Sequence, residues 1–126
     1  MQKSILVIDA DKKQSREFCD LLKRCHYDAT PVYSIDHLAE NIEKSGCRVI
    51  FWDIDSVPAN NRTVRELTLT FPGVYFFCLS SKRFHPELKD AICYHIYACL
   101  NRPIDQDELF YWLRSIEENE SDANGL

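Results

Sequence analysis

With 126 residues, of which 45% are hydrophobic and 28% charged, the chain has the length and composition of one globular domain. A net charge of −5 and 15 scattered basic residues argue against binding to a nucleic-acid backbone. No run approaches the roughly 20 apolar residues of a membrane span, and the first residues lack signal-peptide features, so a cytoplasmic protein without a membrane partner is expected.

The amino-terminal part of the chain predicts a strand, a helix and a second strand. Residues 4–9 contain an uninterrupted aliphatic run that stops at Asp9, typical of a strand that is buried on both faces. Residues 11–27 repeat apolar side chains at helical spacing, and Asp11 is the expected N-cap. Residues 28–33 predict a short strand, which Pro31 assigns to a sheet edge because proline cannot donate to a β-ladder.

The middle of the chain continues this alternation. Ser34 or Asp36 can cap a second helix, and Gly46 is expected to end it. Residues 48–54 predict another fully apolar strand. Residues 60–73 carry a helical apolar stripe that ends at a Pro-Gly pair.

The carboxyl-terminal part predicts two more strands and two more helices. Residues 74–81 and 95–101 read as buried strands, and Pro86 suits the first turn of a helix between them. Residues 105–108 have the form of a capping box, and an apolar stripe at helical spacing follows them.

This order of elements predicts an α/β fold. Five strands alternating with five helices imply a parallel, doubly wound sheet with right-handed crossovers and helices on both faces, which gives three layers. The domain is expected to span residues 1–118, and the polar residues 119–126 to form a flexible tail or the start of a linker. In such sheets the site lies beyond the carboxyl ends of the central strands.

Acids, hydroxyls and one cation follow the predicted strand ends at that edge. They are Asp9, Asp11, Asp53, Asp55, Ser80, Ser81 and Arg102. Neighbouring carboxylates repel each other unless a cation lies between them, and carboxylate oxygens suit Mg²⁺. With a metal bound, a carboxylate can attack a phosphoryl group while the metal, a hydroxyl and a cation neutralise the phosphoryl oxygens. The pattern therefore indicates aspartyl-phosphate chemistry.

The cysteines and histidines carry no comparable pattern. The six cysteines include no C-x-x-C pair and mostly lie in apolar stretches, so they are expected to pack as reduced thiols. The four histidines are dispersed, which gives little support to a zinc site.

The order and spacing of the strand-end residues resemble the receiver domain of two-component response regulators over about residues 3–118. The resemblance implies the flavodoxin-like strand order 2-1-3-4-5 and a sensor histidine kinase or another signalling protein as partner. It also implies that Asp53 is the phosphoacceptor. The Mg²⁺ ligands would be Asp9, Asp53 and the backbone carbonyl of Asp55.

Two further positions match the family's phosphate-contacting or switch residues. Ser80 matches the hydroxyl residue that ends the fourth strand, and Arg102-Pro103 matches a Lys-Pro pair whose peptide bond is cis. A surface ion pair between Arg102 and Asp105 would explain the arginine equally well.

Several residues depart from the family pattern. Ala10 occupies the place of a second acid that ligates magnesium, and Arg102 replaces a lysine although the two side chains are not equivalent. Cys99 stands where an aromatic switch residue is usual. His95 and Ile96 replace a small pair and are expected to add bulk beside the site. We therefore expect weakened Mg²⁺ binding and weak or absent phosphorylation.

The last predicted helix is apolar around more than half its circumference. Phe110 and Tyr111 lie in this stretch, and Tyr94 and Tyr97 lie on the neighbouring helix and strand. In receivers the fourth helix, fifth strand and fifth helix form the usual dimer and effector face. These four residues are therefore a predicted partner face, which also allows homodimers. Aromatic side chains lying flat on the surface are the alternative.

Three functions compete on this sequence. The first is a phosphorylatable receiver, and the second is a pseudo-receiver that keeps the fold and the partner face without phosphorylation. The third is a phosphatase, because residues 49–57 also resemble the haloacid-dehalogenase signature, with Asp53 as nucleophile and Asp55 as general acid/base. That family needs another strand-end acidic pair after Arg102, where the sequence predicts a single helix. A role without catalysis and without direct nucleic-acid binding is therefore preferred.

Overall fold

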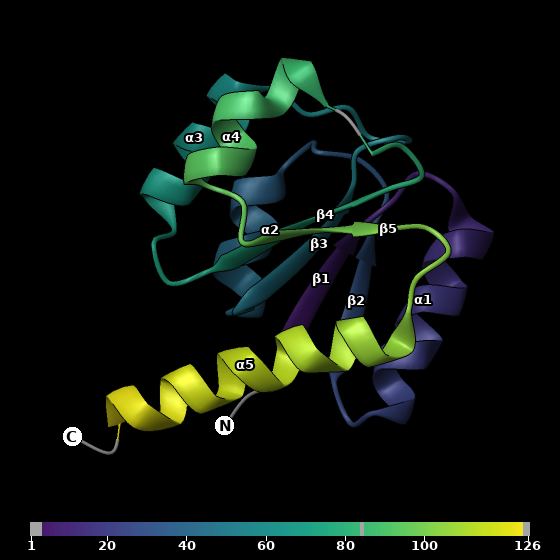
Figure 1. Ribbon diagram of the computed structural model, residues 1–126, viewed down its shortest axis with the longest axis vertical. Helices are drawn as coiled ribbons and strands as arrows, with labels where there is room; N and C mark the ends of the chain where they lie inside the picture. Colours follow the sequence, from purple (N-terminus) through teal and green to yellow (C-terminus); the bar gives the residue numbers. More distant parts are fainter. Residues whose placement is uncertain (1–3, 84, 125–126) are drawn as a thin grey trace.

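The computed structural model describes residues 4–83 and 85–124, which fold into a five-stranded parallel sheet between two layers of helices (Figure 1). The strands are β1 (Ser4–Ile8), β2 (Asp28–Val32), β3 (Val49–Asp53), β4 (Tyr75–Ser80) and β5 (Ala98–Asn101). They lie in the order β2-β1-β3-β4-β5, and each neighbouring pair is parallel. The predicted α/β fold and strand order are confirmed.

Six helical segments connect and follow the strands within these residues. They are α1 (Lys12–Arg24), α2 (Leu38–Ser45), α3 (Asn61–Thr70), the 3-10 turn η1 (Pro86–Leu88), α4 (Lys89–Tyr94) and α5 (Gln106–Asn124). The helix that was expected from Pro86 thus opens as a 3-10 turn. None of the helices in the described ranges is long and apolar enough to cross a membrane.

The sheet separates two hydrophobic cores in the described part of the chain. Helices α1 and α5 cover one face, where Phe51 stacks on Phe77 with ring centroids 4.9 Å apart (Figure 1). Helices α2, α3 and α4 cover the other face, around Ile50, Trp52 and Phe76. Successive strand residues point to opposite faces, so an uninterrupted apolar run is what a strand between two cores requires.

The start of α2 differs from the prediction. The helix begins after His37, which has a left-handed backbone conformation with φ 59°. Ser34 Oγ accepts a hydrogen bond from the N–H of Asp36 at 3.3 Å, so these two residues bond to each other within the preceding loop. The expected cap at either of them was wrong. Gly46 ends the helix in a left-handed conformation, as predicted, with its N–H bound to the carbonyl of Ile42.

Strand β5 is shorter than the apolar run that predicted it. The N–H groups of His95 and Ile96 both donate to the carbonyl of Ala91, so His95 caps the end of α4 and Ile96 follows it, outside the strand. The N–H of Tyr97 then donates to Phe76 and begins the pairing with β4. An apolar residue that follows a helix can thus belong to the core without belonging to the strand.

Two predictions about local chain geometry are confirmed. Asp11 is the N-cap of α1, and its Oδ1 accepts from the N–H of Gln14 at 3.1 Å. Strand β2 lies at an edge of the sheet, and Pro31 pairs there with Val7 of β1.

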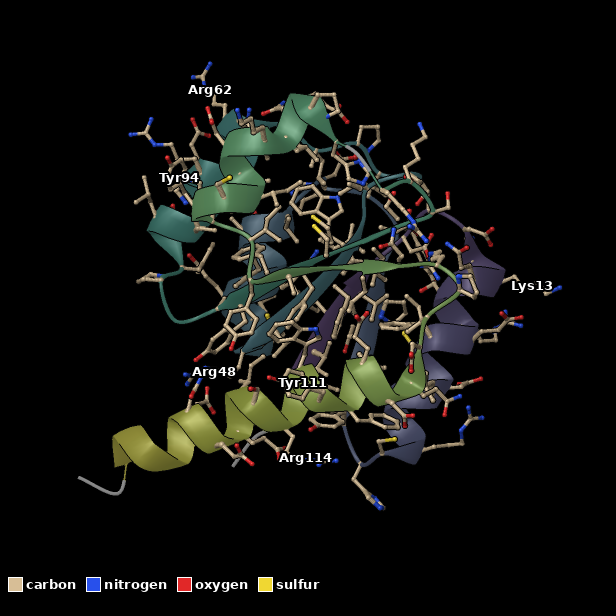
Figure 2. The ribbon with its side chains drawn as sticks, viewed as in Figure 1. Lys13, Arg48, Arg62, Tyr94, Tyr111 and Arg114 are labelled. Atoms are coloured by element: carbon tan, nitrogen blue, oxygen red, sulfur yellow. The ribbon has the colours of Figure 1, made fainter. Side chains whose placement is uncertain are left out.

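Helix α5 continues past the predicted domain end at residue 118. Arg48 lies beside the carboxyl-terminal half of α5 (Figure 2), and its Nη2 is 2.7 Å from Oε1 of Glu120. Residues 119–124 are helical where a tail was expected, and residues 125 and 126 lie outside the described residues. The boundary itself stays a prediction.

Candidate functional site

Four of the predicted site residues lie at the carboxyl edge of the sheet. Asp9 follows β1, Asp53 ends β3, Ser80 ends β4 and Arg102 follows β5. The two acids are 0% and 1% exposed, and Ser80 is buried as well. Buried carboxylates are costly unless a positive charge or hydrogen-bond donors surround them. The groups around Asp9 and Asp53 therefore determine what this site can do.

Arg102 supplies positive charge to both acids. Its Nε donates to Oδ2 of Asp53 at 2.9 Å, and its Nη2 lies 2.9 Å from that oxygen and 3.3 Å from Oδ2 of Asp9. The arginine side chain is only 17% exposed. Asp105, the alternative partner, instead accepts from the N–H of Asp107 at the start of α5. The structure thus places Arg102 inside the site, as a bridge between the two acids.

Sequence reasoning missed two further members of the site, Gln14 and Ser56. Nε2 of Gln14 donates to Oδ2 of Asp9 at 2.8 Å and to Oδ2 of Asp53 at 2.9 Å. Oγ of Ser56 donates to Oδ1 of Asp9 at 3.1 Å and accepts from the N–H of Ala10 at 3.0 Å. Their position in the sequence was the available signal, because both lie in segments that directly follow a site acid.

Backbone N–H groups donate to the remaining acceptor sites of the Asp9 and Asp53 carboxylates. Oδ1 of Asp53 accepts from the N–H groups of Asp55 and Ser56, both at 3.0 Å, and Oδ1 of Asp9 accepts from the N–H of Asp11 at 2.9 Å. With the side-chain donors, each of the four carboxylate oxygens accepts two hydrogen bonds. A carboxylate offers about four lone-pair positions, so both acids are saturated.

This arrangement does not fit a magnesium ion. A metal needs free oxygen lone pairs, and those of Asp9 and Asp53 face N–H and O–H donors. Ala10 adds a methyl group where an acid would ligate, and the Asp11 carboxylate is turned to the cap of α1. No group of three or more His, Cys, Asp or Glu residues within 4–83 and 85–124 is arranged to hold a metal. The guanidinium of Arg102 provides the positive charge internally.

Asp55 forms a second network with the hydroxyls that end β4. Oγ of Ser80 donates to Oδ1 of Asp55 at 2.7 Å, and the N–H and Oγ of Ser81 donate to Oδ2 at 2.8 Å and 2.9 Å. Partial burial raises the pKa of Asp55, but these hydrogen bonds and the nearby Lys82 lower it overall. The hydroxyl of Ser80 is therefore directed at Asp55 and away from Asp53.

The same network argues against the phosphatase alternative. A general acid beside a phosphorylated Asp53 would have to hold a proton, and a raised pKa serves that role. The pKa of Asp55 is lowered, and its carboxylate is engaged by Ser80 and Ser81. The two acids of the motif therefore bind different partners.

A cleft of about 550 Å³ opens beside Arg102. Gln14 and Phe18 of α1 line one side, and Pro103 and Ile104 line the other. The peptide bond between Arg102 and Pro103 is cis, as the resemblance implied. The cleft gives small molecules a route to the guanidinium from the side of α1.

The other family departures lie away from the two acids. His95 and Ile96 precede β5 at its amino end, opposite the carboxyl edge, so the expected bulk beside the site was wrong. Nδ1 of His95 lies 3.2 Å from Oγ1 of Thr68 on α3, and Ile96 belongs to the core under α2 to α4. Cys99 is exposed on β5 and is paired in the ladder with Cys78 of β4.

Aromatic side chains gather along α4, β5 and α5, here called the α4–β5–α5 face. Tyr94 is 78% exposed and Tyr111 62% exposed, and Figure 2 shows them on α4 and α5. Trp112 contacts Tyr97 and Tyr111, with ring centroids 5.5 Å and 5.2 Å away. Phe110 is partly buried against the α1 and α5 core. The predicted partner role of these residues remains a prediction, and it depends on the tyrosines more than on Phe110.

Comparisons with known proteins give matches in structure alone. No protein-family model matches the sequence. No curated protein matches it either. Among solved structures, the chain is similar to the signal receiver domain of an HD domain-containing protein from Pseudomonas fluorescens Pf-5. The sequences are 18% identical, the alignment covers 99% of this chain and 94% of that chain, and the TM-score is 0.82.

Two other solved structures are similar to the same extent. One is the CheY-like response regulator receiver domain protein from Methanospirillum hungatei JF-1, at 15% identity, 97% and 99% coverage of the two chains, and a TM-score of 0.81. The other is the signal receiver domain of a putative LuxO repressor protein from Vibrio parahaemolyticus, at 14% identity, 98% and 96% coverage, and a TM-score of 0.80. The chain therefore has the receiver fold along nearly its whole length.

Proposed function

We propose that this chain is a receiver-like domain of two-component signalling in which Asp53 accepts phosphate weakly or not at all. The observation that carries the proposal is the hydrogen bond from Nε of Arg102 to Oδ2 of Asp53 at 2.9 Å. Nε2 of Gln14 donates to the same oxygen. An oxygen whose lone pairs both face donors is a poor nucleophile towards phosphorus, and the other oxygen is bound by backbone N–H groups.

The charge balance supports the same expectation. Phosphorylation would replace the single negative charge of Asp53 with about two on the phosphoryl oxygens, in a pocket that also holds the Asp9 carboxylate and one guanidinium. Nε and Nη2 of Arg102 already bind Asp53 and Asp9, so only part of the guanidinium is left for the phosphoryl oxygens. The site does not fit a divalent cation, and Arg102 is the cation in contact with Asp9 and Asp53 among the described residues.

We place the output of the domain in protein contacts of the α4–β5–α5 face rather than in catalysis. Exposed tyrosines such as Tyr94 and Tyr111 supply the aromatic surface that is enriched in protein interfaces. The proposed partners are a sensor histidine kinase, another signalling protein or a second copy of the chain. A direct nucleic-acid contact is not part of the proposal, since the net charge is −5.

A cytoplasmic setting completes this proposal. All six cysteines are free thiols. Reducing compartments maintain cysteines in that form.

Phosphorylation by acetyl phosphate tests the proposal directly. The protein is incubated with acetyl phosphate and Mg²⁺, and intact-mass spectrometry measures the fraction that gains one phosphoryl group. We expect a minor fraction or none, and Asp53→Asn provides the control for modification at other sites. Complete conversion in the native chain that is lost in D53N would refute the proposal.

A pseudo-receiver without any phosphorylation is the second candidate. The saturation of Asp53 together with the methyl side chain of Ala10 favours it. Beryllium fluoride, a phosphoryl mimic, separates the two candidates when it is titrated with Mg²⁺ in a Trp112→Phe background, where Trp52 is the remaining indole. A response of Trp52 fluorescence supports the weak receiver, and a flat titration supports the pseudo-receiver.

A further inference from the structure

Two cysteines face the same side of the sheet on neighbouring strands. Cys78 of β4 and Cys99 of β5 are direct partners in the parallel ladder. Neighbouring strands lie about 4.8 Å apart, and paired residues point to the same face. That spacing lies within the range of about 4.4–6.8 Å between Cα atoms that a disulfide bond spans. The ladder pairing therefore brings the two Cα atoms within the range that a disulfide bond can span.

The two thiols differ in accessibility and in acidity. Cys78 is buried in the core under α2 to α4, whereas Cys99 is exposed. A hydrogen bond from the Cys78 thiol to the Cys99 sulfur lowers the pKa of Cys99, and the same bond together with burial raises the pKa of Cys78. An exposed thiol of lowered pKa beside a second, buried thiol of raised pKa is the arrangement found in peroxide-sensing cysteine pairs.

The other cysteines make useful comparisons. Cys19 and Cys47 are buried, and burial raises the pKa of both thiols. Cys93 lies on α4 and is exposed like Cys99. It provides an internal measure of how an accessible thiol of this protein reacts.

We propose that Cys99 and Cys78 form a redox-modification site at which a hydroperoxide closes a reversible cross-strand disulfide. The Cys99 thiolate attacks the peroxide, the O–O bond breaks, and Cys99 becomes a sulfenic acid while hydroxide leaves. The Cys78 thiol then attacks the sulfenic sulfur; the S–S bond forms, the S–O bond breaks, and hydroxide leaves with the Cys78 proton as water. A dithiol reductant restores both thiols. This site does not depend on phosphorylation of Asp53.

Peptide mapping under non-reducing conditions tests the proposal. Cys93→Ser serves as the parent protein, because no lysine or arginine separates Cys93 from Cys99 and trypsin therefore leaves both on one peptide, which ends at Arg114 since trypsin does not cut between Arg102 and Pro103. After treatment with hydrogen peroxide, tryptic peptide 66–82 is expected to be linked to peptide 90–114, with the loss of two hydrogens. Dithiothreitol should separate them again.

Two single variants distinguish the steps. In Cys78→Ala the reaction should stop at the sulfenic acid, which dimedone traps on Cys99, and in Cys99→Ser no linked peptide should form. Circular dichroism verifies that the core variant C78A is folded. Because Cys99 is exposed, C99S is expected to disturb the fold less than C78A does. In the native chain, peroxide should oxidise Cys99 several times faster than Cys93. The oxidation of Cys99 is measured as its dimedone adduct together with the disulfide to Cys78.

Trp52 supplies a second readout in the folded protein. It is paired with Cys78 in the β3–β4 ladder, so a disulfide on Cys78 should quench its fluorescence in a Trp112→Phe background. The proposal is overturned if peroxide modifies Cys93 as fast as Cys99 in the native chain and no linked peptide forms in the folded Cys93→Ser parent. Quenching that persists in C99S would equally count against it.

Discussion

The hydroxyl of Ser80 donates to Oδ1 of Asp55 at 2.7 Å, while the Asp53 carboxylate is bound by Arg102 and Gln14. The carboxyl edge of the sheet thus carries two side-chain networks, one around Asp55 and one around Asp53, which are linked through the backbone N–H of Asp55. A side-chain substitution can perturb one without direct loss of a side-chain contact in the other.

The Asp55 network should make stability depend on pH. Because hydrogen bonds lower the pKa of Asp55 in the folded state, its ionised form stabilises the fold above the ordinary Asp pKa of about 4, and this contribution is lost as pH falls below that value. Asp55→Asn removes the effect. Urea unfolding should therefore show a difference between native protein and D55N that is largest near neutral pH and shrinks in acid. A difference that does not change with pH would contradict this account, and Asp107→Asn is the matched surface control.

Arg102→Ala should destabilise the protein strongly. The substitution leaves Asp9 and Asp53 buried without their cation, and breaking a buried ion pair costs about 3–5 kcal/mol in unfolding free energy. Arg102→Lys keeps a positive charge and should cost less. Urea titration measures both variants, and a loss below about 1 kcal/mol for R102A would show that the guanidinium does not compensate the acids.

Magnesium binding should appear when a second acid is introduced beside Asp9 and Arg102 is replaced by lysine. Ala10→Asp adds a ligand and Arg102→Lys frees oxygens of Asp53, so the double variant should bind Mg²⁺ while the native chain does not. Trp52 fluorescence in a Trp112→Phe background reports binding next to Asp53. An equal response of the native chain, or none in a folded double variant, would mean that Arg102 does not substitute for the metal.

The two neighbouring aromatic residues of α5 should respond differently to a charge. Tyr111→Asp changes an exposed side chain and should alter unfolding free energy by about 0.5 kcal/mol or less. Phe110→Asp places a carboxylate against the α1 and α5 core and should cost about 1–3 kcal/mol. Self-association or kinase binding should weaken in Y111D and Tyr94→Asp. If sedimentation and partner binding stay the same in both tyrosine variants, the face is not used.

The end of α5 should contribute modestly to stability. Glu120→Ala removes an ion pair with Arg48, whose side chain is about half exposed, so the loss should stay below about 1 kcal/mol. A double-mutant cycle with Arg48→Ala isolates the pair. Strict additivity of the two single variants would mean that the ion pair contributes nothing to stability.

The sequence was sufficient to predict the fold because apolar runs, helical stripes and strand-end acids agree with one another along most of the chain. The prediction failed at the start of β5, where the same run of residues covers the end of a helix and the beginning of a strand. The sequence of residues 95–101 predicts one strand, yet the N–H groups of His95 and Ile96 bond to the helix carbonyl of Ala91. Hydrogen-bond partners of the backbone, which a hydrophobicity pattern does not encode, decide where β5 begins.

The sequence predicted the two buried acids of the candidate site, but not all of the side chains that contact them. Asp9 and Asp53 were found because parallel strands deliver their ends to one edge. Gln14 and Ser56 were missed because they reach the acids from a helix and a loop, whose side-chain directions depend on how those segments pack. The choice of Ser80 between Asp53 and Asp55 likewise depends on side-chain geometry that spacing does not reveal.

Pro31 has a consequence for how copies of this protein can meet. It lies in β2, an edge strand, and a strand added on the outer side of β2 would find no N–H donor at this residue. The opposite edge, β5, has only four residues and offers few backbone groups for pairing. Both ends of the sheet thus oppose growth by strand addition and the aggregation that follows from it. Association between molecules is thereby directed to side-chain surfaces, where single substitutions can tune it.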